Sequence, residues 1–237
     1  MNTILKKTIM HSLLLIGMAV MLKAQENVWL KLEKGDAVVL LPKTAQWQPL
    51  VSKSEIPSRT FLLTKENSSV KIFVATEIYE VDESNYIFIE DVIEKSRPQL
   101  VAELTRIEAE QLPNSEHSVD SLRTNEVGLT YGNQPQIQSS ITPIPFRTER
   151  FNAVNSFLKH NRYDAAVLTL KRMLVKYPSL YLDQAVVEQL FSLYDRLGLV
   201  GFLFDESAKL IPIIKNEVFS NVLMNWNKKA KNTMIGN

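Results

Sequence analysis

The sequence predicts an α+β protein: a small antiparallel β module (barrel or sandwich) with one helix, linked to an α-helical hairpin domain. Three observations predict this class. Residues 28–90 contain short runs rich in β-branched and aromatic side chains, separated by polar turn clusters, as strands do. Residues 147–232 repeat apolar side chains at helical spacings of three and four. Between these regions, residues 113–146 have no sustained period.

The N-terminal residues 1–24 have the order of a secretory signal peptide. Lys6 and Lys7 form a positive start, residues 9–22 are almost entirely apolar, and Ala24 ends the run with a small side chain. The apolar run of about 14 residues is shorter than the ~20 needed to span a bilayer. This favours cleavage after Ala24, with retention as an N-terminal anchor as the alternative. We therefore expect an exported protein, periplasmic or associated with the cell surface, with no membrane span after cleavage.

Composition excludes some classes of protein. Without residues 1–24, the chain has 24 basic and 26 acidic side chains, a formal charge of −2. Nucleic-acid binding requires a clustered basic excess, so no nucleic-acid partner is expected. The chain has no cysteine. It therefore forms no disulfide, and burial alone must stabilise its core.

The β-rich module is predicted to span residues 25–112. Its strand signals are VWLKL (28–32), AVVLL (37–41), RTFLLTK (59–65), VKIFVATEIYEVD (70–82) and NYIFIED (85–91). Their spacing predicts five to seven strands. Residues 96–112 then predict one amphipathic helix, because Leu100, Val101, Leu104 and Ile107 recur at helical spacing and Pro113 stops the pattern. We expect its apolar stripe to pack on the β module.

Residues 113–146 are predicted to be a flexible linker between two domains. The segment contains four of the ten prolines, and an ordered loop of this length would be unusual inside one compact domain. Residues 147–237 are predicted to form four or five helices joined by short turns, an α-hairpin stack. Pro178, Gly198 and Pro212 mark its later boundaries.

The stretch NRYDAAVLTLKRMLVKYP, residues 161–178, is similar to the second helix of a tetratricopeptide repeat, a 34-residue helix-turn-helix. The resemblance is carried by Tyr163 at the helix start, Ala166 at a close-approach position, Leu170 at a large apolar position and Pro178 at the end. Residues 148–215 then resemble one well-matched repeat followed by a degenerate one. Asn161 replaces the customary turn glycine, and an unrelated helical bundle is the alternative.

This resemblance implies a curved helical array that presents a concave surface to a peptide or protein. On the first helix, the implied partner-binding residues are Phe151, Asn155 and Lys159. The family's chaperone-tail clamp places Lys four residues before Asn. Because Phe151 precedes Asn155 here, binding of a carboxylate tail is not expected.

Residues 28–90 also resemble the FecR-type periplasmic domain of iron-citrate-type signal transducers. Trp47, Pro49 and Leu50 match its Trp-x-Pro-Leu element, and Ser68 to Val70 match a later polar turn. Residues 52–54 and 58, mostly serine, stand where the family usually has turn glycines. The resemblance implies a structural or sensing module and no catalysis.

The sequence contains no recognisable metal-binding, phosphate-binding or catalytic motif. His117 and His160 lie far from any metal-spaced cluster, and no glycine-rich phosphate loop or nucleophile elbow is present. Seven carboxylates fall between residues 77 and 94, namely Glu77, Glu80, Asp82, Glu83, Glu90, Asp91 and Glu94. Two of them buried together would suit acid-base chemistry, but their alternation with apolar residues favours a solvated sheet face.

The sequence therefore favours an exported, non-enzymatic protein-interaction scaffold or adaptor in the bacterial cell envelope. Its expected partner is another envelope or surface protein, with no metal and no cofactor. The first alternative is a periplasmic sensor module of an envelope signalling system. The second is a carbohydrate-binding or hydrolytic protein that uses the β module, which requires converging acids or an exposed tryptophan platform.

Overall fold

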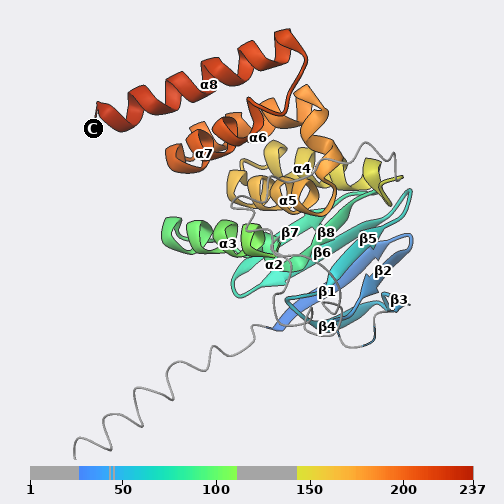
Figure 1. The fold of residues 1–237 in the computed structure, drawn as a ribbon. Helices are drawn as coiled ribbons and strands as arrows, with labels where there is room; N and C mark the ends of the chain where they lie inside the picture. Colours follow the sequence, from blue (N-terminus) through green and yellow to red (C-terminus); the bar gives the residue numbers. More distant parts are fainter. Residues whose placement is uncertain (1–26, 43, 45, 111–142, 237) are drawn as a thin grey trace, which may run out of the picture.

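The computed structural model describes residues 27–42, 44, 46–110 and 143–236 (Figure 1). The predicted signal peptide and residues 113–142 of the predicted linker lie outside this part of the chain. The fold is α+β, which confirms the predicted class: two four-stranded antiparallel sheets lie beside a stack of helices. Figure 1 shows the helices layered on one side of the sheets, with α8 farthest from them.

The described residues form eight strands, more than the five to seven predicted. The first sheet has the order β4-β1-β6-β7, with bounds Lys53–Pro57, Asn27–Lys34, Ser69–Val74 and Glu77–Val81. The second has the order β3-β2-β5-β8, with bounds Trp47–Pro49, Ala37–Leu40, Phe61–Thr64 and Tyr86–Phe88. Strands β3 and β4 were missed because they are short, with three and five residues, and show no clear alternation of apolar side chains. Neither sheet closes into a barrel.

The core of the β part follows from strand alternation. Val28 and Leu30 of β1 are fully buried, whereas Trp29 between them lies 41% exposed on the opposite face. Leu62 of β5 and Ile87 of β8 contribute the buried side of the second sheet. All these buried side chains belong to one apolar cluster, which also includes the buried side chains of the helices.

The helices are α2 (Ile89–Val92), α3 (Arg97–Ala109), α4 (Arg147–Lys159), α5 (Tyr163–Lys176), the 3₁₀ turn Pro178–Leu182, α6 (Gln184–Arg196), α7 (Val200–Leu210) and α8 (Glu217–Ile235). The turns between them have local causes. Asn161 and Gly198 adopt positive φ angles of 59° and 66°, a conformation that these two residue types tolerate best. Pro212 follows the end of α7, as predicted. Ala166 is fully buried within α5.

Helix α3 packs against α5, so the prediction that it packs on the β module is wrong. Its buried stripe of Leu100, Leu104 and Ile107 is the predicted one, but its partner is different. Residues 165–171 of α5 are all buried, because α5 is covered by helices on several sides at once. Figure 1 shows α3 beside α5 within the helical layer.

The β part and the helical stack are in direct contact. The Arg162 guanidinium donates a hydrogen bond to the Val92 carbonyl at 2.8 Å. The Asn152 amide donates to the Ser84 carbonyl at 2.9 Å, and α4 packs against β8. The division into two domains stays a prediction, and these contacts show that the two parts pack together. No helix of the described part has both the length and the apolarity to cross a membrane.

Candidate partner-binding groove

A hollow of about 430 Å³ opens in the helical stack. Leu158 at the end of α4 and Tyr163 at the start of α5 form one wall. The face of α6 forms the floor, with Gln189, Ser192, Leu193, Asp195 and Arg196, and Trp226 of α8 forms the opposite wall. A second hollow of about 320 Å³ follows along α8 and includes Glu188, Val222, Asn225, Trp226 and Lys229. Trp226 lines both hollows, and we call the two together the α4–α6–α8 groove.

Sequence spacing places these side chains on shared helix faces. Gln189, Ser192 and Arg196 of α6 follow one another at intervals of three and four. Val222, Trp226 and Lys229 of α8 do the same. These polar and apolar side chains therefore point into the space between the helices.

Helices α4 and α6 run in the same direction along the groove. Near their N-termini, the Arg147 guanidinium forms an ion pair with the Asp183 carboxylate at 3.2 Å. At their other ends, Leu158 faces the C-terminal half of α6 across the hollow. Helix α5 packs against both α4 and α6, so it lies between these two helices in the stack.

The groove has aromatic walls and a charged rim. The Trp226 ring packs edge-on against the buried Phe191, with ring centroids 6.3 Å apart. The Lys229 ammonium lies 5.0 Å from the Trp226 ring centroid and pairs with Asp195 at 2.7 Å. On the opposite wall, the Arg196 guanidinium lies 3.9 Å from the Tyr163 ring centroid. This mixture of aromatic surface and polar groups suits the binding of a side chain or peptide segment.

The three residues singled out from the sequence lie on α4, next to the groove. Phe151 is half-buried beneath the Arg147 guanidinium, at 5.8 Å from its ring centroid. Asn155 and Lys159 are exposed. None of the three lines the hollow, whereas Leu158 on the same helix does. Sequence reasoning did not single out Tyr163 and Trp226 as lining residues, although both lie in the region 147–232 with apolar side chains at helical spacing.

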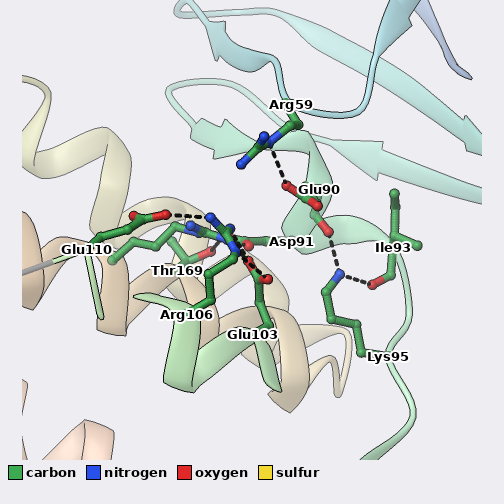
Figure 2. A network of polar contacts seen from close by, with 10 residues as sticks. Arg59, Glu90, Asp91, Ile93, Lys95, Glu103, Arg106, Glu110 and Thr169 are labelled. Atoms are coloured by element: carbon green, nitrogen blue, oxygen red, sulfur yellow. Dashed lines mark hydrogen bonds and ion pairs between the residues drawn. The ribbon is translucent and has the colours of Figure 1, made fainter. Parts of the chain in front are cut away.

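The sequence predicted that the carboxylates between residues 77 and 94 lie on a solvated sheet face. This prediction is wrong for one of them. Asp91 of α2 is completely buried where the β part meets α5 (Figure 2). Its carboxylate accepts hydrogen bonds from the Thr169 hydroxyl at 3.1 Å and from Arg172 Nε at 3.2 Å. Glu77, Glu80, Asp82, Glu83 and Glu94 are exposed, as predicted.

A second carboxylate joins the same network. Glu103 of α3 accepts hydrogen bonds from both Arg172 and Arg106, and Arg106 also contacts Glu110 (Figure 2). Burial by itself would raise the pKa of Glu103, but the hydrogen bond from Arg106 and the charge of Arg172 lower it to about 2. Burial raises the pKa of Asp91, and the charges of Arg172 and Lys95 oppose that rise. Arginine therefore holds both carboxylates as parts of a structural junction.

The lowered pKa of Glu103 predicts a loss of stability in acid. The ionised carboxylate stabilises the folded state fully above its ordinary pKa of 4.5, and this contribution is lost as the pH falls towards 2. The raised pKa of Asp91 acts in the opposite sense, since its protonation favours the folded state. Urea unfolding is measured between pH 2 and 6. The Glu103→Gln variant should have a lower free energy of unfolding than wild type at pH 6, and that free energy should fall less steeply as the pH is lowered. The exposed control Glu94→Gln should keep the wild-type slope, and an unchanged slope in Glu103→Gln would contradict the assignment.

The fold and the groove define an α+β protein with a groove-bearing helical stack. No family model matches the chain, and no curated protein or solved structure shows significant similarity to it. In the described part of the chain, no group of three or more His, Cys, Asp or Glu side chains is arranged to hold a metal ion.

Proposed function

We propose that the protein is an exported, non-enzymatic interaction scaffold or adaptor of the bacterial cell envelope. Its helical stack binds a segment of another envelope or surface protein in the α4–α6–α8 groove. The observation that carries the proposal is the pair of hollows that share Trp226 and are lined by residues of α4, α5, α6 and α8.

The chemistry of the groove supports a protein partner. Tryptophan, tyrosine and arginine dominate the binding energy of protein interfaces, and Trp226, Tyr163 and Arg196 line this groove. Gln189 and Ser192 on the floor offer hydrogen-bond donors and acceptors to a peptide backbone. The similarity of residues 148–215 to a tetratricopeptide array supports the same function, because such arrays bind proteins on the surface lined by their first helices.

The test is capture of the partner by the intact chain, followed by measurement of its affinity. Tagged protein is used on envelope extract, the captured protein is identified and purified, and binding is measured by calorimetry. Trp226→Ala should weaken binding by about tenfold or more, the effect of truncating an interface anchor. Met224→Ala is the matched control, since Met224 is 46% exposed on the same helix and does not line the groove. Equal affinities for wild type and Trp226→Ala would refute the proposal.

A further inference from the structure

A lysine and a glutamate are buried against each other inside the helical stack. Lys171 Nζ of α5 lies 2.6 Å from each carboxylate oxygen of Glu206 of α7. Among the ion pairs of the described residues, it is the one in which both side chains are almost inaccessible to water, at 3% and 6% exposure. The amine and the carboxyl group therefore face each other with little surrounding water.

Three further polar groups surround this pair. Glu108 of α3 contacts the same Nζ at 2.8 Å and is 29% exposed, so it lies between the buried pair and solvent. The Tyr181 hydroxyl donates a hydrogen bond to Glu206 Oε1, and the Tyr194 hydroxyl donates one to Oε2 at 2.9 Å. Burial, together with the Glu206 charge, raises the pKa of both tyrosines well above the ordinary value, so both hydroxyls remain donors.

The five groups together are what the condensation of an amine with a carboxyl group requires. The Lys171 amine is the nucleophile, and the Glu108 carboxylate can accept its proton. The tyrosine hydroxyls donate to the carboxyl oxygens, on which negative charge increases during attack. Well-oriented groups within one molecule reach effective molarities of roughly 10⁵–10⁸ M, which favours a bond that free side chains in water do not form. Condensation also removes two buried charges, whose desolvation is costly.

We propose that Lys171 and Glu206 become joined by an intramolecular amide bond after the chain has folded. The Lys171 ammonium gives one proton to Glu108, which delivers it to a Glu206 oxygen. The neutral Nζ then attacks the Glu206 carboxyl carbon, so that the N–C bond forms and the bond from carbon to the protonated oxygen breaks. A second proton from the nitrogen leaves with that oxygen as water. The reaction needs no oxidant, reductant or further reactant.

The amide bond connects α5 to α7 between residues that are 35 positions apart in the chain. Covalent closure of a loop restricts the unfolded chain and stabilises the folded one, as a disulfide does, and this chain has no cysteine. Chains that have not condensed keep the pair as an ion pair, with the stability effects of one. The inference does not depend on the α4–α6–α8 groove, so either proposal stands or fails without the other.

The test is the mass of the intact purified protein, measured after denaturation. We expect the wild type to be lighter than its sequence by the mass of one water molecule. Trypsin does not cleave after an acylated lysine, so digestion should release residues 163–172 joined to residues 197–209. Lys171→Arg keeps the positive charge but presents a guanidinium that stays protonated, so it should have its full sequence mass. The matched control Lys176→Arg changes an exposed lysine of the same helix and should lose water as wild type does.

A second variant tests the proton acceptor without changing either of the joined residues. Glu108→Gln should slow the appearance of the joined peptides in freshly synthesised protein by about a hundredfold or more, since its amide cannot accept the proton. Glu110→Gln, at an exposed carboxylate nearby, should keep the wild-type rate. A wild-type protein of full sequence mass overturns the proposal. A water loss that maps to any other pair, including Lys171 with Glu108, overturns it as well, and an unchanged rate in Glu108→Gln overturns the proton-transfer step.

Discussion

Replacing Arg172 with methionine should destabilise the protein by about 3–5 kcal/mol, the effect of leaving a buried charge without its partner. Asp91 is completely buried, and Arg172 is its cationic partner at 3.2 Å. Methionine retains most of the apolar stem of Arg172 and removes its guanidinium, which lies 4.6 Å from the Phe88 ring centroid, so the loss reports on the charged group and its contacts. Urea unfolding at neutral pH gives the free energy of unfolding for both proteins.

Two further variants distinguish the effect of the buried Asp91 charge from the effect of the neighbouring charged groups. Arg106 contacts Glu103 and Glu110 and is partly exposed, so Arg106→Met should destabilise by about 1 kcal/mol or less. The double variant Asp91→Leu with Arg172→Met should recover much of the loss, because it removes both charges together. If Arg172→Met and Arg106→Met have equal effects, Arg172 does not hold Asp91 and the description of the junction is wrong.

Replacing Glu206 with leucine should have the second large effect, about 3 kcal/mol of lost stability. Lys171 is 2% exposed, and its ammonium pairs with the buried Glu206 carboxylate at 2.6 Å. The hydroxyls of Tyr181 and Tyr194 also donate to this carboxylate. Burial, with the Glu206 charge, raises the pKa of both tyrosines well above the ordinary value, so both hydroxyls keep their protons.

The expected loss of stability lies at the lower end of the range of about 3–5 kcal/mol for a broken buried ion pair, because Lys171 keeps one partner. Glu108 of α3 contacts the same ammonium at 2.8 Å. The control Glu188→Leu changes a partly exposed carboxylate on α6 whose hydrogen-bond donor is Gln184, and it should stay within about 0.5 kcal/mol of wild type. The stability of both variants is measured by thermal and urea unfolding. A Glu206→Leu protein as stable as Glu188→Leu would mean that Lys171 is not held in the folded core.

Local patterns predicted the elements of this fold well. The alternation of Val28, Trp29 and Leu30 gave both the strand and its buried side. The turn at Asn161 and the break at Pro212 were readable, because each depends on the conformational preference of one residue. Strands β3 and β4 were not, since WQP is held by pairing with β2 and KSEIP by pairing with β1, and not by their own composition.

Local sequence patterns could not predict contacts between segments that lie far apart in the chain. Asp91 sits in an acidic stretch that predicted exposure, and the arginine that permits its burial lies 81 residues away. For the same reason α3 was expected on the β module: its apolar stripe shows that it is buried but does not identify its partner. Phe151, Asn155 and Lys159 lie on α4 but do not line the groove, and their binding role stays a prediction. The walls of the groove come from several helices, and no single helix pattern encodes which helices lie together.

The measurement that tests the central claim most directly is photo-crosslinking from inside the groove. Benzoylphenylalanine replaces Ser192, an exposed residue on the groove floor, and in a parallel protein it replaces Ala208, which is exposed on α7 outside the groove. We predict that the probe at position 192 forms a covalent adduct with one envelope protein, and that adding Trp226→Ala abolishes the adduct. The probe at position 208 should give none. No protein adduct from position 192, or the same adduct from both positions, would contradict the assignment of the α4–α6–α8 groove as the partner-binding surface.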